Sequence, residues 1–414
     1  MRLFDVFVLL FVISALLSFI NYRYLRLPKT VGLMFLSLGV SLGLMVIKFF
    51  GLDLITSATS MVKSINFSET LLTGVLSLLL FAGSLHINLE DFLKQKLPIS
   101  LLATFSVAIS TLVIGFSAFY LFPLVGFFPS LLACFLFGAL ISPTDPIAVL
   151  ALLKTSKVSK SIEMKIAGEA LLNDGIGVVV FLTILKLMSG TESINANFVI
   201  LLFLQEAVGG ILYGLAIGFI AFQFLRRIDN HEIEILISLA LVMGGYSFAS
   251  FLHVSGPLAM VAAGLFIGNH GRMFAMSETT RTNLDIFWRV IDDILNSTLF
   301  VLVGFEALLV NIRSEYILAG IIAIPLALVA RFTSVWFSAQ LSRMQKRFSP
   351  HAIKILTWGG LRGGISLALA LSLPSGEIRD AFILITYMIV VSSILIQGFT
   401  MSHLLKSINV RSVA

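Results

Sequence analysis

The chain has 414 residues, of which 58% are hydrophobic and only 12% charged. An average soluble domain carries about 25% charged residues, so the composition excludes an ordinary soluble fold and indicates a protein embedded in a membrane. The net charge of +6 comes from basic residues spread over short connections between apolar stretches. This distribution does not form a basic surface for nucleic acid, and we expect no nucleic-acid partner.

Apolar stretches follow one another along the whole chain, and most are close to the roughly 20 residues that a helix needs to cross a bilayer. They predict an all-α polytopic membrane protein with about 13 transmembrane helices. The sequence shows no Walker motif, metal-ligand spacing or pair of nucleophile and base, so we expect neither an enzyme nor a cofactor. The predicted spans cover residues 4–22, 29–49, 67–88, 98–121, 129–153, 164–188, 199–225, 232–252, 256–269, 285–310, 316–341, 350–373 and 379–405.

The basic residues are distributed unevenly if these spans alternate in direction, because twenty Lys and Arg residues then lie on one side and six on the other. Cytoplasmic loops carry the excess of Lys and Arg. We therefore expect a multi-pass protein of the plasma membrane, the inner membrane of the cell, with the amino terminus outside and the carboxyl terminus in the cytoplasm. The basic side holds Arg23, Arg26, Lys29, Lys94, Lys96, Lys154, Lys157, Lys160, Lys165, Arg226, Arg227, Arg272, Arg281, Arg289, Arg343, Lys346, Arg347, Lys354, Lys406 and Arg411, and the other side holds Arg2, Lys48, Lys63, Lys186, Arg313 and Arg379.

Two of the predicted helices contain breaks at corresponding positions. Thirteen spans divide into six, one and six, and the odd number between them makes the two groups of six inverted repeats. The fifth helix contains residues 142–146 (SPTDP), and the twelfth contains residues 359–364 (GGLRGG). Prolines remove backbone donors and glycines weaken a helix. Paired breaks of this kind are the best sequence indication of a binding site in a secondary transporter.

Two carboxylates are expected near the centre of the bilayer. Asp145 precedes Lys154 by nine residues, and Asp174 follows Lys165 by nine. At about 1.5 Å per helical residue, each carboxylate then lies about 14 Å deep in a core about 30 Å thick. Burial and a like-charged neighbour both disfavour the ionised form of a carboxyl group, so a proton and a small cation can compete for such a pair.

Three neighbouring polar side chains complete the candidate cation site. Ser142 and Thr144 add hydroxyl oxygens on the broken fifth helix, and hard cations prefer oxygen ligands. Asn173, beside Asp174, offers an amide that can hold the break through a hydrogen bond but cannot titrate.

Glu169 lies four residues before Asn173 and therefore on the same face of the predicted helix, turned away from Asp174. We expect it to form a structural ion pair, because an unpaired buried charge is costly. Arg331 and Arg362 are both candidate partners. A depth count along straight helices slightly favours Arg362.

These residues belong to three longer stretches, 142–150 (SPTDPIAVL), 168–175 (GEALLNDG) and 359–363 (GGLRG). Together they closely resemble three signatures of the monovalent cation/proton antiporter family, in its sodium/proton exchanger branch. Residues 255–259 and 300–304 resemble further family stretches, so the resemblance covers nearly the whole chain. It implies exchange of sodium or lithium for protons, electroneutral and one for one, by elevator-like alternating access.

The resemblance also implies roles for the site residues. By position, Asp174 is similar to the family's ion-binding aspartate, and Asp145 and Thr144 to its partners, so Asp174 and Asp145 would hold the transported monovalent cation. Asn173 matches the asparagine of electroneutral members.

The same resemblance implies a homodimer in lipid, in which a core ion-transport domain moves against a dimerisation domain. It pairs Glu169 with Arg331 and gives Arg362 the role of supporting the crossed helices. The core domain would comprise residues 94–189 and 316–406, the dimerisation domain residues 1–93 and 231–315, and a linking helix residues 198–227.

The chain departs from some prokaryotic members at two positions. It has residues 81–83 (FAG) where those members carry a glutamate in the third helix, and Ala170 where they carry a serine. In those members both side chains can supply oxygen ligands to the sodium site. Because this chain lacks them, potassium/proton exchange on the same scaffold is an alternative. A cation channel and a transport-inactive membrane sensor are further alternatives, and intact Asp145, Asn173 and Asp174 argue against the sensor.

Overall fold

The computed structural model describes residues 3–49, 74–146, 149–150, 152–153, 159–188, 196–306, 313–343 and 350–407. Within these ranges the regular structure is helical throughout, with no strand, which confirms the all-α prediction. Every predicted span overlaps a helix, whereas the start of the third span, the end of the tenth, and Ile147 and Ala148 of the first signature lie outside the described residues.

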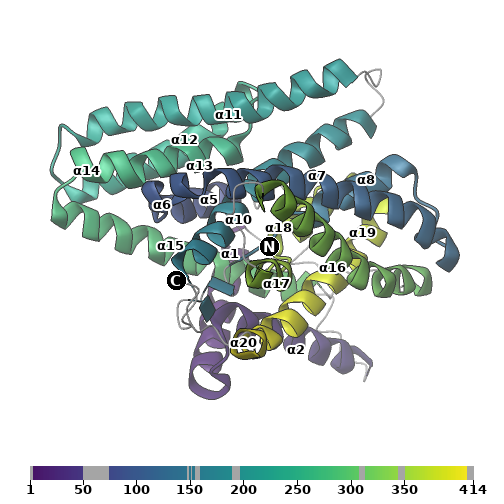
Figure 1. Cartoon of the computed structure of the whole chain (residues 1–414). Helices are drawn as coiled ribbons and strands as arrows, with labels where there is room; N and C mark the ends of the chain where they lie inside the picture. The colour runs from purple at the N-terminus through teal and green to yellow at the C-terminus, as the bar shows by residue number, and fades with distance from the viewer. Residues whose placement is uncertain are drawn as a thin grey trace.

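Figure 1 shows the helices of the described ranges in chain order. Seven of those in the described ranges are long and apolar enough to cross a membrane, and shorter apolar helices cover residues 31–41, 76–85 and 131–141. The helices are α1 (Leu3–Ile20), η1 (Asn21–Leu25), α2 (Lys29–Phe49), α5 (Leu76–Leu85), α6 (Leu89–Lys94), α7 (Lys96–Leu121), η3 (Phe122–Val125), α8 (Leu131–Ile141), α10 (Lys160–Met188), α11 (Ala196–Leu225), α12 (His231–Phe251), α13 (Gly256–Phe266), η4 (Ile267–Gly271), α14 (Arg272–Phe274), α15 (Glu278–Glu306), α16 (Ser314–Arg343), α17 (Pro350–Trp358), α18 (Gly364–Leu371), α19 (Glu377–Ser392), η5 (Ser393–Gln397) and α20 (Gly398–Ser407).

Polar residues in the connections start several of these helices. The side chains of Asn88, Ser130, Asn230 and Ser255 each accept a hydrogen bond from a backbone N–H in the first turn of the helix that follows. The first N–H groups of a helix have no partner within it, so these caps explain why α6, α8, α12 and α13 begin where they do.

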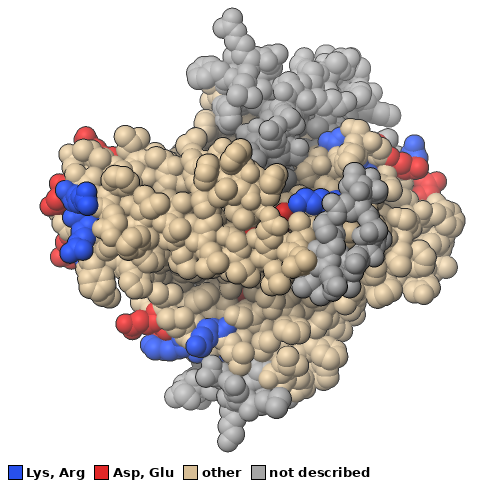
Figure 2. Space-filling model, turned by 90° about the horizontal axis from the view of Figure 1, so that it is seen from above, with Lys and Arg blue, Asp and Glu red and all other residues tan. Residues whose placement is uncertain are grey.

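The outer surface has the polarity of a membrane protein. Charged side chains gather towards the ends of the face shown in Figure 2 and leave most of its described surface uncharged. Large apolar side chains on the long helices are exposed, among them Phe219 of α11 and Phe332 of α16, each half exposed. A broad apolar face of this kind is stable in contact with lipid, and the chain is a polytopic membrane protein.

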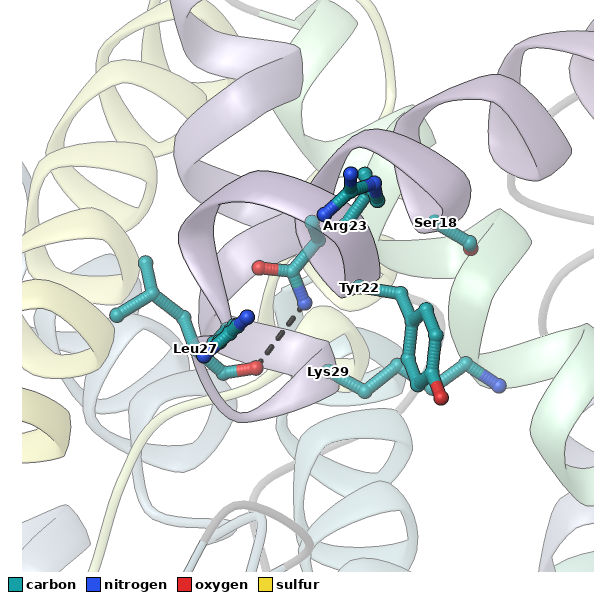
Figure 3. Close-up of a pocket in the computed structure, with 7 residues that line it drawn as sticks. Ser18, Tyr22, Arg23, Leu27 and Lys29 are labelled. Atoms are coloured by element: carbon teal, nitrogen blue, oxygen red, sulfur yellow. Dashed lines mark hydrogen bonds between the residues drawn. The ribbon is translucent and has the colours of Figure 1, made fainter.

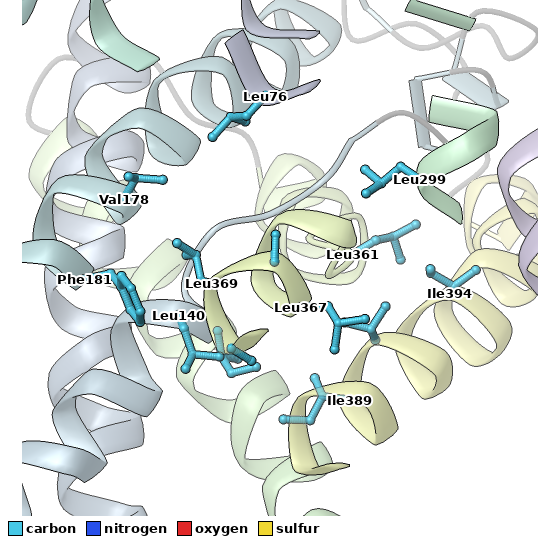
Figure 4. Packing of buried hydrophobic residues seen from close by; sticks show 14 of the residues in the cluster. Leu76, Leu140, Val178, Phe181, Leu299, Leu361, Leu367, Leu369, Ile389 and Ile394 are labelled. Carbon is cyan, nitrogen blue, oxygen red and sulfur yellow. The ribbon is translucent and has the colours of Figure 1, made fainter. Parts of the chain in front are cut away.

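The helices pack in two groups. Helices α7, α8 and α10 pack with α16, α18 and α19, whereas α2, α5, α12, α13 and α15 pack with one another. Helix α11 lies along the upper edge of Figure 1, where it packs against α12 and α13 and also contacts α10. Buried apolar side chains surround the breaks of the first group, among them Leu140, Phe181, Leu369 and Ile389 (Figure 4).

Three basic corners gather at one end of the molecule. The side chain of Asn269 donates to the carbonyl of Ile87 at 3.0 Å and accepts from the N–H of Leu89 at 2.8 Å, which joins the α13 end to the α5–α6 corner. The Ser277 hydroxyl donates to Asp229 at 2.7 Å, which joins the corner before α15 to the α11–α12 corner. These connections agree with the alternation of spans that the basic residues predict.

Candidate ion-binding site

The break in the fifth predicted helix begins where α8 ends, at Ile141, and residues 142–146 are not helical. Pro143 and Pro146 have no N–H to continue the helical ladder. The carbonyl groups at the end of α8 therefore need partners from elsewhere in the fold, because a buried carbonyl without a hydrogen bond is costly.

The break in the twelfth predicted helix separates α17 from α18, and it lies against the first break. The N–H of Asp145 donates to the carbonyl of Leu361 at 2.8 Å. The buried Arg362 guanidinium donates through Nη1 to the carbonyls of Ser142 at 2.6 Å and Pro143 at 3.0 Å. The two breaks, more than 200 residues apart in sequence, thus form one crossing, and Arg362 supplies the partners that the end of α8 lacks.

Helix α10 meets this crossing through Asn173. Its Nδ2 donates to the Thr144 hydroxyl at 2.8 Å, and both side chains are buried. The amide thereby fixes the position of the first break relative to Asp174, the next residue on α10. Asp174 is 8% exposed.

Asp174 and Asp145 line the same cavity, which has a volume of about 660 Å³. Pro146 of the first break and Gly364, at the start of α18, line it as well. At its polar end the lining includes His86, Asp91, Lys160 and Glu163. The cavity therefore leads from the two central carboxylates towards the end of the molecule where the basic corners gather.

Ser142 has a different position from the other oxygen donors. Its hydroxyl donates to the carbonyl of Gly138 at 2.7 Å and contacts the Thr111 hydroxyl at 3.2 Å. Among the described residues, the lining of the cavity includes Asp145 and Asp174 but neither Ser142 nor Thr144. The side chain of Ser142 thus faces α7, and its contact with the crossing is through its carbonyl group.

Glu169 pairs with Arg331 of α16. The two Nη atoms of Arg331 bond the two carboxylate oxygens, Nη2 to Oε2 at 3.0 Å and Nη1 to Oε1. Arg331 also donates through Nε and Nη2 to the carbonyl of Leu356 on α17. Both side chains are at most 5% exposed, so this bidentate pair is a buried connection of α10, α16 and α17.

The depth count that favoured Arg362 as the partner of Glu169 is wrong. Arg362 lies on an extended segment, where 1.5 Å per residue does not apply, and its guanidinium is engaged with the carbonyls of Ser142 and Pro143. The same count placed Arg331 deeper, yet its guanidinium bonds both carboxylate oxygens of Glu169.

Glycines in the second break allow the charged side chains to approach. A Cβ at Gly363 would collide with the carboxylate of Asp145, and one at Gly360 would collide with the guanidinium of Arg331. The absence of a side chain at these two positions is what permits close contact between backbone and charge.

Two polar residues of the cavity were missed by sequence reasoning. Asp292 and Asn296 of α15 line it together with Asp174, and the Asn296 amide donates to Asp292 at 3.0 Å. The signal in the sequence was an acidic residue inside the predicted span 285–310. It was obscured by the mixed charges of residues 278–293.

Comparison with known proteins agrees with this architecture. The family model described as "Sodium/hydrogen exchanger, transmembrane" matches residues 9–407. The chain is 44% identical over 401 residues to the Na(+)/H(+) antiporter NhaP of Pseudomonas aeruginosa, with 96% of this chain and 95% of that protein covered. It is 33% identical over 396 residues to the Na(+)/H(+) antiporter NhaH of Halobacillus aidingensis, with 93% of each covered.

Solved structures of similar fold include the sodium proton antiporter MjNhaP1 from Methanocaldococcus jannaschii, with a TM-score of 0.79. The superposition covers 98% of this chain and 99% of that chain at 19% sequence identity, which supports the fold alone. Family model, sequence identity and the crossing of two broken helices agree, and the chain belongs to the transmembrane sodium/hydrogen exchanger family.

Proposed function

We propose that this protein exchanges sodium, or lithium, for protons across the membrane, and that cation and proton compete at Asp174. The observation that carries the proposal is the pair of carboxylates, Asp174 and Asp145, in one cavity at the crossing of the two breaks. Two carboxylates in such surroundings repel each other when both are ionised. A bound proton or a bound cation relieves that repulsion, so each can displace the other.

The transport cycle needs one titrating group per cation. In the proposed cycle Asp174 is alternately protonated and cation-loaded, while Asp145 remains charged and the Arg362 guanidinium holds its segment through the carbonyls of Ser142 and Pro143. Asn173 fixes Thr144 through the 2.8 Å hydrogen bond and does not titrate. One proton then moves for each monovalent cation, and the exchange is electroneutral.

Coordination of the cation depends on few side-chain oxygens in this chain. Gly83, within the stretch 81–83 where some family members carry a glutamate, and Ala170, where they carry a serine, both line the cavity. Carboxylate oxygens of Asp174 and Asp145, backbone carbonyls of the breaks and water are the ligands that remain. The relatives described above are named sodium/proton antiporters, which favours sodium over potassium as the substrate.

Alternating access is proposed to move one helix group against the other. The core would comprise residues 94–189 and 316–406, and the dimerisation domain residues 1–93 and 231–315, with residues 198–227 as the linking helix. The cavity supports this division, because its lining combines α10 and α18 of one packing group with α5 and α15 of the other. In the dimerisation domain α1 exposes a continuous apolar face, which is available for a second copy of the chain or for lipid.

The orientation follows from the basic residues. We place the amino terminus outside, the carboxyl terminus in the cytoplasm, and the protein in the plasma membrane. The cavity then opens towards the cytoplasm, since His86, Asp91 and Lys160 line its polar end, and the conformation is inward-facing.

Purified protein in proteoliposomes tests the function directly. A preset pH gradient is followed by a pH-sensitive dye while sodium, lithium or potassium is added in turn, with the membrane potential held at zero. Sodium and lithium should collapse the gradient without current. If potassium alone collapses the gradient, the exchange mechanism stands but the substrate is potassium. A current without saturable exchange would indicate a channel. No response to any cation would indicate a sensor.

Substitution of Gly363 tests the contact at the crossing. We expect Gly363→Ala to lower sodium-dependent exchange at least tenfold, because the added methyl group displaces the Asp145 carboxylate, and overpacking of this kind costs about 1–3 kcal/mol. Gly244→Ala in α12 is the matched control, since a Cβ there meets nothing within 4 Å. Exchange by Gly363→Ala at the wild-type rate would show that the position of Asp145 is not critical.

A further inference from the structure

The corner between α1 and α2 forms a second cavity, open to the surface, which shares no lining residue with the ion-site cavity. Its volume is about 680 Å³. Three basic side chains, Arg23, Arg26 and Lys29, line it together with Tyr22 and Asn21 (Figure 3). A cavity of this charge is suited to an anionic ligand.

The backbone of this corner is held in a defined shape. Arg26 adopts a left-handed conformation with φ of 53°, which is uncommon for a residue other than glycine. Its N–H donates to the carbonyl of Asn21 at 2.7 Å, and the Asn21 amide donates to the carbonyl of Leu27 at 3.0 Å (Figure 3). Asn21 is 5% exposed. The basic side chains therefore project from a turn that is fixed by hydrogen bonds, and not from a frayed helix end.

The positive charge of the cavity is only partly balanced. Lys29 pairs with Asp293 of α15, with 3.4 Å between Nζ and Oδ1. Arg23 lies over the ring of Tyr24, 5.8 Å from its centroid. No acidic residue lines the cavity, and neither Arg23 nor Arg26 has an ion pair within the ranges that the structure describes. Two guanidinium groups thus remain for an external anion.

The cavity lies at the end of the exposed apolar face of α1. Leu16 and Phe19 near the end of α1 are more than half exposed, and they lead directly to the exposed rings of Tyr22 and Tyr24. Tyrosines are enriched at the level of the lipid headgroups. With the orientation proposed above, the corner faces the cytoplasmic leaflet, which carries anionic lipids in most cells.

We propose that this corner binds the phosphate of an anionic phospholipid, with the acyl chains along the exposed apolar face of α1. Arginine bonds phosphate in a bidentate manner, and basic pockets between transmembrane helices on this side of a membrane suit such headgroups. The adjoining apolar face distinguishes a lipid from free phosphate, because only the lipid gains from contact with both parts. Lys29 remains paired with Asp293 and adds positive charge to the lining of the cavity.

Native mass spectrometry of the purified protein in detergent tests the site, with phosphatidylglycerol as the probe and phosphatidylcholine as the neutral comparison. The double variant Arg23→Gln/Arg26→Gln should bind phosphatidylglycerol roughly tenfold more weakly or worse, because each basic residue near an anionic surface contributes measurably to binding. Arg226→Gln/Arg227→Gln is the matched control, with two exposed arginines at another corner of the same end, and should bind like the wild type. Arg23→Lys/Arg26→Lys should retain most of the binding.

Several outcomes would overturn the proposal. An equal loss in the control pair would show general surface charge only, and competition by glycerol phosphate at the affinity of the lipid would indicate a site for free phosphate. A change in the dimer fraction of the Gln variant in lipid-free detergent would assign the corner to a protein interface. If that variant does not fold, the salt dependence of lipid binding by the wild type tests the proposal. Binding of phosphatidylglycerol must weaken as salt rises, because salt screens the attraction between charges, while binding of phosphatidylcholine must stay constant.

Discussion

Asp174→Asn is expected to abolish sodium-dependent proton movement in proteoliposomes, down to the level of empty vesicles, while the protein still folds. The amide has nearly the size of the carboxylate and fits the same cavity, but it can neither carry a proton nor bring a negative charge to the cation. Exchange requires both. The measurement is the collapse of a preset pH gradient on addition of sodium, together with thermal stability and elution as a single species in detergent.

Glu206→Gln provides the matched control for this change of acid to amide. Glu206 is a buried carboxylate of α11 that pairs with Lys186 at 3.0 Å and does not line the ion-site cavity. We expect it to retain sodium/proton exchange close to the wild-type rate. If Asp174→Asn exchanged sodium for protons at a comparable rate, the titrating group would have to be another carboxylate, with Asp145 the first to test in the same way.

Arg331→Met is expected to lower the stability of the folded protein by about 3–5 kcal/mol, because it leaves Glu169 as an uncompensated buried charge. The methionine retains much of the apolar stem but none of the donors, so the carbonyl of Leu356 also loses its partner. Denaturant unfolding in mixed micelles measures the loss. Arg313→Gln is the control, since the Arg313–Glu377 pair is more than half exposed and such pairs contribute about 0–1 kcal/mol.

The double variant Glu169→Gln/Arg331→Met shows how much of the stability lost in Arg331→Met is due to the unpaired charge of Glu169 and how much to the lost contacts of Arg331. With both charges gone, most of the stability lost in Arg331→Met should return, since neutral replacement of a buried pair is often tolerated. A double variant as unstable as the single one would show that the hydrogen bonds of Arg331 to Leu356 dominate over the charge of Glu169. A single variant as stable as the control would exclude a structural role for the pair.

Much of the candidate site could be predicted because its residues are unusual for the apolar segments in which they occur. Pro143, Pro146 and the glycines of 359–364 interrupt apolar segments, and Asp145 and Asp174 each stand nine residues from a basic residue of the same connection. The prediction of two broken helices needs only backbone chemistry. The assignment of ion-binding roles to Asp174, Asp145, Thr144 and Asn173 stays a prediction until the variants are measured.

Other features could not be read from the same residues. The direction of the Ser142 hydroxyl, towards Thr111 and away from the cavity, depends on how α7 packs against α8. Asp292 and Asn296 enter the cavity wall because α15 lies against α5 and α18. A straight-helix depth count cannot represent the extended segment that carries Arg362.

The sequence by itself determined that this is a polytopic helical membrane protein with two broken helices and carboxylates within its apolar segments, because span length, proline, glycine and charge act through the local cost of placing a backbone or a side chain in lipid. The family resemblance implied that Arg331 pairs with Glu169, 162 residues away, and the depth count favoured Arg362; the tertiary structure decided for Arg331 and placed Arg362 at the end of α8. The physical reason is that a buried charge is compensated by whichever partner the packing brings within hydrogen-bond distance, and that distance is set by helix crossing, not by separation along the chain.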